Sequence, residues 1–216
     1  MSTKILIPAV HPHHQRLSDM MQTVLSKYDV RSVFLSYSTD CKKHLLLIYI
    51  SSSQISDEAS GSNWIKKAFH QLDTQIIILG SSDITRHLRL GSLFINRFCT
   101  EHSLIYLKAG HEVSYPVLEK QLKKFKVYKN EYYHNHDLIS TEVRKAENSN
   151  SLTLAYQLYH TLYEHHIYHL EFSCLGRTYY DESLDKRLLR LENFLPQIKS
   201  LFLKKTESTY YLIDAI

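Results

Sequence analysis

Histidines are the most numerous candidates for chemistry in this sequence, which contains fourteen of them. His165 and His169 are one helical turn apart, as are His160 and Glu164. Such pairs hold zinc when a third ligand converges on them. The chain has no HExxH arrangement and no closely spaced cysteines, and in so histidine-rich a chain close spacings also arise by chance. We expect structural histidines and predict no metal and no other cofactor, with a histidine-rich metal-binding protein as the weakest alternative.

Five lysines between positions 120 and 129 form the one basic run, with aromatic residues interleaved. Lys120, Lys123 and Lys124 share one broad helix face and can contact RNA phosphates. The acidic residues that flank the run and a net charge of only +4 favour a solvated face instead. Tyrosines such as Tyr179 and Tyr180 can stack on bases, although at helical spacing such residues typically pack half-buried.

The elements that would position these groups are clearest between residues 158 and 196. Apolar residues recur at intervals of three to five, as on one buried helix face, and Gly176 follows the last of them. The residues of this face are Leu158, Leu162, Ile167, Leu170 and Leu175. A second helix buries Leu184, Leu188, Leu191 and Leu195 and ends at Pro196. The pattern predicts a helical hairpin with a polar corner from Arg177 to Glu182.

This hairpin resembles the HEPN family (higher eukaryotes and prokaryotes nucleotide-binding), whose helical bundles often occur in ribonucleases and toxin–antitoxin systems. His160 and Glu164 match the family's first pair, Gly176 its turn, and Glu182-Ser183-Leu184 stands in place of His-x-Leu. The family's ribonuclease signature is an Arg followed closely by a His. Arg177 matches the Arg, but Glu182 occupies the His position.

In that family the Arg would stabilise charge on the phosphate while the His moves a proton. The resemblance therefore implies a catalytic set of Arg177, Glu182 and His160 if the chain is active. An Arg at a helix corner is, however, more often an ion-pair or capping residue, and Asp181 or Glu182 would be its partner. Since the imidazole is missing, we favour an inactive site.

The first half of the chain alternates between helical and strand patterns. Helices are expected at 14–28, 63–72 and 83–101, and strands at 30–37, 44–50, 75–79 and 103–107, with a Ser-rich loop at 51–62. Gly80-Ser81-Ser82-Asp83 is typical of either an anion-binding loop or a helix cap. We favour the cap at Ser82 or Asp83, because the carboxylate would repel a phosphate.

Residues 1–112 resemble the minimal nucleotidyltransferase fold, which is often fused in front of HEPN helices. Active members carry a Gly-Ser turn and then two carboxylates one residue apart, which hold two metal ions. Here Ser36-Tyr37-Ser38 replaces the Gly-Ser turn and Lys43-His44-Leu45-Leu46 replaces the carboxylates. Asp40 alone cannot assemble a two-metal site, so the resemblance implies an inactive copy.

Residues 113–216 are expected to be entirely helical, after a junction at 110–115. Helices at 116–144, 152–175 and 183–203, with a short tail, predict a bundle of four or five helices. The expected fold class is therefore α+β, with a small mixed-sheet nucleotidyltransferase-like α/β domain (1–112) followed by an all-α HEPN-like bundle (113–216).

The composition indicates an ordinary globular protein, with 22% charged and 44% hydrophobic residues. Cys41, Cys99 and Cys174 are far apart and odd in number, which is typical of reduced thiols in a cytoplasmic protein. No apolar run reaches the ~18 residues that span a bilayer, and the first ten residues do not form a signal peptide, so no membrane partner is expected.

The sequence leads to two main functional hypotheses. The first is a non-catalytic regulatory module that binds a nucleotide, RNA or a protein and, as the HEPN resemblance implies, forms a homodimer through its C-terminal helices. The second is a metal-independent ribonuclease that uses Arg177 with Glu182 or a nearby histidine.

Overall fold

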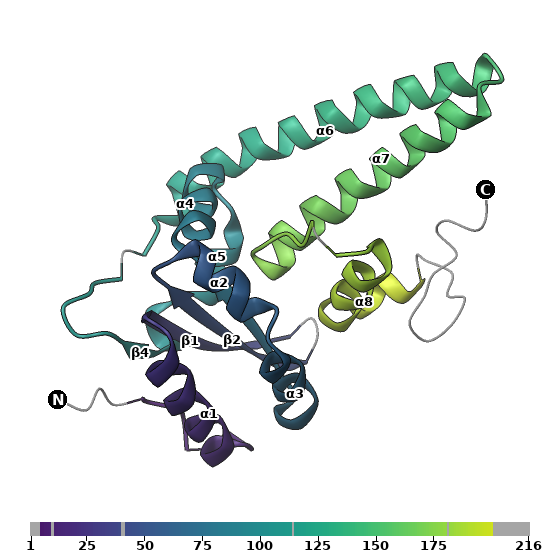
Figure 1. The fold of residues 1–216 in the computed structure, drawn as a ribbon. Helices are drawn as coiled ribbons and strands as arrows, with labels where there is room; N and C mark the ends of the chain where they lie inside the picture. The colour runs from purple at the N-terminus through teal and green to yellow at the C-terminus, as the bar shows by residue number, and fades with distance from the viewer. Residues whose placement is uncertain (1–4, 10, 40–41, 114, 181, 201–216) are drawn as a thin grey trace. The chain divides into compact units, whose positions relative to one another are not determined.

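A computed structural model describes residues 5–9, 11–39, 42–113, 115–180 and 182–200. The chain separates into two compact units, residues 1–122 and 123–216. The first holds a four-stranded sheet with helices, and the second is helical in its described part (Figure 1). The predicted α+β class is thereby confirmed.

The sheet of the first unit is mixed. Its strands are β1 (Val30–Ser38), β2 (Lys43–Ile50), β3 (Thr74–Leu79) and β4 (Leu104–Leu107), in the order β3-β2-β1-β4. β1 pairs antiparallel with both β2 and β4, whereas β2 and β3 are parallel. The parallel pair requires a crossover connection, which α2 (Ser53–Ser60) and α3 (Asn63–Leu72) supply.

One face of this sheet packs on the main apolar core. Alternate strand residues such as Val33, Ile48 and Ile76 lie there, because side chains along a strand point to opposite faces in turn. The first helix, α1 (His14–Lys27), contributes Leu17 and Met21 to the same core, and α3 contributes further apolar side chains. Figure 1 shows α1 and α3 on this side of the sheet.

The opposite face of the sheet is covered by α4 (Ser81–Leu90) and α5 (Leu93–Phe98). These two helices correct the single helix predicted at 83–101. Gly91 ends α4 in the left-handed region, with φ of 70°, and the Ser92 hydroxyl accepts a hydrogen bond from Phe94 N to begin α5. Ser103 follows in a short 3₁₀ turn, Glu101–Ser103, before β4.

The Ser-rich segment 51–62 is another correction, because it contains helix α2 rather than a loop. Ser52 caps this helix by accepting a hydrogen bond from Ile55 N, and Ser56 and Ser60 donate to carbonyls of the preceding turn. Small side chains at Ser56 and Ala59 let the helix approach its neighbours closely, and both are buried.

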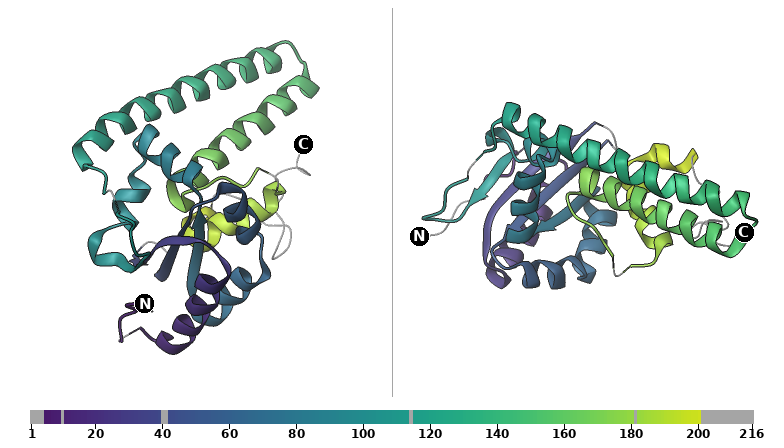
Figure 2. Two further views of the ribbon diagram at one scale, coloured as in Figure 1. Left: turned by 60° about the vertical axis from the view of Figure 1, so that its left-hand side comes forward. Right: turned by 90° about the horizontal axis from the view of Figure 1, so that it is seen from above.

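The described part of the second unit contains α6 (Leu118–Asn148, which begins in the first unit), α7 (Leu152–Leu170) and α8 (Leu184–Phe194). A π-helical turn (Glu171–Leu175) extends α7, and a 3₁₀ turn (Pro196–Ser200) follows α8. Both views in Figure 2 show α6 and α7 side by side and antiparallel. The predicted helix at 183–203 therefore ends early, and positions beyond 200 lie outside the described residues. Among the described helices, none is both long enough and apolar enough to cross a bilayer.

Candidate functional site

The polar corner between α7 and α8 is organised by a buried ion pair. The Arg187 side chain is 1% exposed and that of Glu171 is 0% exposed. Arg187 Nε donates to Glu171 Oε1 at 3.1 Å, and its Nη2 donates to Oε2 at 3.0 Å. Arg187 Nη1 also donates to Glu164, which is partly exposed. The guanidinium therefore connects the middle of α7, its final turn and α8.

Burial and charge oppose each other within this group. Burial alone would lower the pKa of Arg187, but hydrogen bonds and charge from Glu171 and Glu164 raise that pKa above its ordinary value. Burial raises the pKa of the Glu171 carboxyl, and the contacts with Arg187 act in the opposite direction. The close bidentate geometry is that of an ionised carboxylate with a guanidinium.

The loop after α7 folds back onto the same carboxylate. Gly176 ends the π-helical turn with φ of 71°, a conformation that glycine adopts without strain. Three residues later, Tyr179 N donates to Glu171 Oε2 at 3.2 Å. Glu171 therefore fixes the position of the segment that carries Arg177, Tyr179 and Tyr180.

A second charged group lies on the outer side of this loop. Arg190 Nη2 donates to Glu182 Oε1 at 2.7 Å and to Oε2 at 2.8 Å. The Arg190 guanidinium carbon lies 3.6 Å from the centre of the Tyr179 ring, and that of Arg177 lies 5.4 Å from it. The Tyr179 ring therefore lies close to two guanidinium groups. Glu182, predicted as a proton acceptor, is bound by a guanidinium.

The other predicted residues of this site differ in exposure. Arg177 is 9% exposed, and Tyr180 is 63% exposed, with its ring 5.4 Å from that of Tyr168. His160 is exposed on α7, and Glu164, its partner in the family motif, binds Arg187. Arg190 contacts both Tyr179 and Glu182 and so brings these two residues together. Within the described part of the chain, His160 makes no hydrogen bond or ion pair with either of them.

The predicted basic face lies on α6. Lys120, Lys123 and Lys124 are all exposed near the start of this helix. Contact with RNA phosphates at these positions stays a prediction.

Histidine and tyrosine side chains form the contact between α6 and α7. The Tyr132 hydroxyl hydrogen-bonds His166 Nδ1 at 2.8 Å, and His165 donates from Nε2 to the Tyr132 carbonyl at 3.2 Å. The Tyr128 hydroxyl hydrogen-bonds His169 Nδ1 at 2.5 Å. Burial lowers the pKa of both His165 and His166. These histidines have a structural role here, and no group of three or more potential metal ligands occurs within the described ranges.

In the first unit, the positions compared with the nucleotidyltransferase carboxylates hold other chemistry. Lys43 Nζ lies 2.9 Å from Asp73 Oδ1, and the side chains of Leu45 and Leu46 are fully buried. Neither Asp nor Glu occurs in β1, β2, β3 or β4. Ser36, in the place of the Gly-Ser turn, donates its hydroxyl to the Phe98 carbonyl at 2.9 Å. Asp40 lies outside the described residues.

The helix cap predicted at Ser82 or Asp83 lies at Gly80 instead, and the Asp83 side chain supports it from the third residue of the helix. Asp83 Oδ2 accepts a hydrogen bond from Gly80 N at 2.9 Å, and Gly80 itself is the residue that precedes the helix. Ser82 N donates to Ser53 Oγ at 3.0 Å, which ties the start of α4 to α2. The Gly80 N–H is thus bound by the Asp83 carboxylate and the Ser82 N–H by the Ser53 hydroxyl, so neither N–H group is available to an anion.

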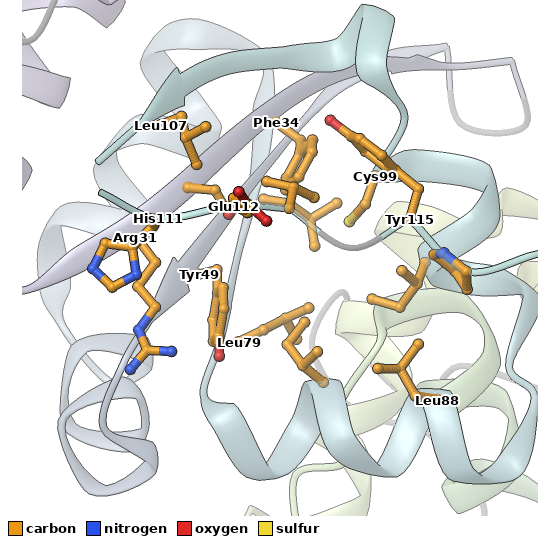
Figure 3. Close-up of a pocket in the computed structure, with 16 residues that line it drawn as sticks. Arg31, Phe34, Tyr49, Leu79, Leu88, Cys99, Leu107, His111, Glu112 and Tyr115 are labelled. Carbon is orange, nitrogen blue, oxygen red and sulfur yellow. The ribbon is translucent and has the colours of Figure 1, made fainter. Parts of the chain in front are cut away.

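Sequence patterns did not reveal a cavity of about 220 Å³ within the first unit (Figure 3). The cavity lies between one face of the sheet and helices α4 and α5, and the segment after β4 closes it. Phe34, Leu47 and Leu79 line it from the strands, and the polar residues Arg31, His111 and Glu112 lie at one end. In the sequence, Phe34 and Leu47 alternate with residues of the main core. This alternation indicates that the second face of the sheet is also covered, but it does not indicate a cavity on that face.

Two regions therefore stand out for function, the charged corner between α7 and α8 and the cavity beneath α4 and α5. The first is the place where a HEPN-like ribonuclease would act, and the second corresponds to no predicted site. No protein-family model, curated protein or solved structure matches this chain.

Proposed function

We propose that this chain is a non-catalytic regulatory protein, built from a nucleotidyltransferase-like α/β unit without metal ligands and a HEPN-like helical unit. Its role is to bind a nucleotide, RNA or a protein partner. One observation carries the proposal: strand β2, where paired carboxylates would be needed, presents the Lys43–Asp73 ion pair and buried leucines. Two metal ions cannot be held by such a strand, because their binding requires acidic oxygen ligands.

The helical unit supports the same conclusion. Three carboxylates near the corner are bound by arginines: Glu171 and Glu164 by Arg187, and Glu182 by Arg190. Both carboxylate oxygens of Glu182 accept hydrogen bonds from Arg190 Nη2, so the atoms that would accept a proton are already engaged. Glu182 is therefore poorly suited to replace the missing imidazole.

Tyr180 is the most accessible aromatic residue of the corner and the best candidate for stacking on a base. The exposed Lys123 and Lys124, which belong to the same unit, would contribute contacts with phosphates. A ligand bound in this way would be held by stacking and charge, with no group placed for proton transfer.

A binding experiment tests this role. Fluorescence anisotropy of labelled single-stranded RNA and of a labelled adenine nucleotide is measured with the full chain, with Tyr180→Ala and with Tyr37→Ala. Tyr37 is a matched control, since it is 55% exposed and lies in the other unit. We expect Tyr180→Ala to weaken binding about tenfold, as loss of one stacked base would, and Tyr37→Ala to have no effect. Equal affinities for all three proteins would contradict a role for the corner.

A metal-independent ribonuclease is the second candidate. It is favoured by the position of Arg177 beside Tyr179, in the same cluster as Glu182. If the chain cleaves RNA, Arg177→Ala should abolish cleavage and the exposed control Arg144→Ala should not. The non-catalytic proposal expects no cleavage by any of the three proteins.

A homodimer through the C-terminal helices and a cytoplasmic location belong to the same proposal. Exposed apolar side chains on the helical unit, including Leu138, Leu152 and Leu154, would be covered in a dimer. Among the described residues, Cys99 and Cys174 form no disulfide, which is consistent with a reducing compartment. Light scattering should give twice the 25.4 kDa mass of the chain, whereas a monomer at micromolar concentration would argue against the dimer.

A further inference from the structure

The cavity of the first unit has the size and lining of a site for a small molecule. Its volume of about 220 Å³ lies below the ~300–1,000 Å³ of drug-sized pockets. Apolar side chains dominate its walls: Phe34, Leu47, Leu79, Ile84, Leu88 and Ile95. A single aromatic ring or a short branched chain would fill such a space and displace water from apolar surface.

The segment that closes the cavity is held at both ends. On one side, Lys108 N donates to the Arg31 carbonyl at 2.9 Å, and Lys108 Nζ pairs with Asp29. On the other side, Asn96 Nδ2 donates to the Pro116 carbonyl at 3.0 Å. The wall that carries Glu112 is therefore fixed by contacts within the fold. Preorganisation of this kind reduces the entropy lost on binding.

The two charged side chains at the mouth of the cavity, Arg31 and Glu112, differ in their hydrogen-bond partners. Arg31 Nε donates to Ser51 Oγ at 2.8 Å, and Ser51 in turn donates to Asp29 Oδ2 at 2.8 Å. For Glu112, by contrast, the described residues supply no ion pair and no side-chain hydrogen bond. Figure 3 shows its carboxylate among the lining side chains, at the end of the cavity near Arg31 and His111. Glu112 is the one carboxylate among the residues that line this cavity.

Aromatic rings accompany this carboxylate. Phe34 contributes a ring from the sheet and Tyr115 contributes one from the closing segment. The Tyr49 ring already has a cation beside it, since the guanidinium carbon of Arg31 lies 5.7 Å from its centre. Aromatic faces attract cations through their quadrupoles, and a carboxylate adds a charge-assisted hydrogen bond. A small ligand with a positive head and an apolar body would satisfy both parts of the lining.

We propose that this cavity binds a small organic ammonium ion, with its ring or branched chain between the sheet and helices α4 and α5 and its ammonium group at Glu112. The site lies entirely in the α/β unit. Its occupation therefore does not require nucleotide or RNA binding by the helical unit, and its test is separate from the test of that role.

The experiment is a titration of the full chain with 2-phenylethylamine at pH 7, followed through the methyl resonances of leucine and isoleucine. The neutral 2-phenylethanol and the anionic 3-phenylpropionate serve as matched probes of similar shape. We expect saturable shifts at Leu47, Leu79 and Leu88 with the amine and about tenfold weaker binding of the other two, because only the amine gains a charge-assisted hydrogen bond. Equal binding of the alcohol, tighter binding of the acid, or no shift at these methyl groups would overturn the proposal.

Two variants locate the ammonium group. Glu112→Gln keeps the shape of an exposed side chain and should weaken amine binding about tenfold while leaving alcohol binding unchanged. Glu58→Gln, an exposed change on α2 outside the cavity lining, should leave both unchanged. Amine affinity that survives in Glu112→Gln would contradict the assignment of the charge.

Discussion

Arg187 of α8 and Glu171 at the end of α7 form an ion pair that is withdrawn almost completely from water, with side chains 1% and 0% exposed. The pair is bidentate, and Glu171 also accepts the backbone N–H of Tyr179. A charge buried this deeply is stable only while its partner remains. The pair therefore fixes how α7, the corner loop and α8 are joined.

Replacing Glu171 with Gln should destabilise the protein by about 3 kcal/mol, because it leaves the buried guanidinium without its full counter-charge. The free energy of unfolding in urea measures the effect. Glu142→Gln is the control, since Glu142 pairs with Lys145 on the surface of α6 and an exposed pair contributes less than about 1 kcal/mol. Equal effects for both variants would show that Arg187 finds sufficient compensation in Glu164.

Gly80 should tolerate no side chain. A Cβ atom there would lie 2.7 Å from Ser53 Cα and 2.6 Å from Ser56 Oγ, so helices α2 and α4 would have to separate. We expect Gly80→Ala to cost about 1–3 kcal/mol of unfolding free energy, as overpacking generally does.

Gly61→Ala provides the matched control for this change. A Cβ at Gly61 would meet nothing closer than 3.7 Å, and its φ of −77° suits any residue. The variant should be neutral or slightly more stable, because alanine restricts the unfolded chain. A loss of stability in Gly61→Ala as large as that in Gly80→Ala would refute the close-approach explanation.

His11 should make the first unit sensitive to acid. Burial, and then repulsion from the rings of His44, His13 and His14, lower its pKa from 6.5 to about 4. Because the pKa of His11 is lower in the folded protein, the unfolded chain binds a proton at a pH at which the folded protein does not. Protonation therefore favours unfolding. Stability should therefore fall as pH decreases from 6.5 towards 4, and NMR titration should find the His11 midpoint near 4.

His11→Phe should reduce this acid sensitivity, because it removes the proton-binding group and keeps an aromatic ring at this buried position beside His44. His160→Gln is the control, as His160 is exposed on α7 and its substitution should leave the pH profile unchanged. An ordinary titration midpoint near 6.5 for His11 would show that its ring is solvated.

Most strands and helices follow from local patterns, and the departures have physical causes. Apolar runs predict all four strands. A strand buried on one face shows alternating apolar residues in the sequence, and a strand buried on both faces shows a short continuous apolar run. The segment 51–62 was mistaken for a loop because serine is usually a turn residue. Here Ser56 and Ser60 satisfy their hydroxyls on the helix itself and fit a narrow space. The break at Gly91 depends on a left-handed conformation that a lone glycine does not reveal.

The sequence predicts the charged corner between α7 and α8 only in part. The pattern placed Arg177 and Glu182 between two helices, but not the pairing of Glu182 with Arg190 or of Glu171 with Arg187. Such pairs depend on how α8 packs against the end of α7, which no local spacing encodes. The cavity has the same origin, because an unfilled volume arises from the fit of α4 and α5 over the sheet and leaves no trace in periodicity.

We propose that this chain performs no turnover, and a transfer and cleavage assay tests this proposal most directly. The full chain is incubated with labelled ATP, with a protein acceptor or RNA, and with Mg²⁺ or Mn²⁺, and products are compared with a buffer control. We expect no transferred nucleotide and no cleaved RNA above the control, because β2 offers no carboxylate and Glu182 is bound by Arg190. Transfer of label that depends on the metal, or RNA cleavage that disappears in Arg177→Ala, would contradict the claim.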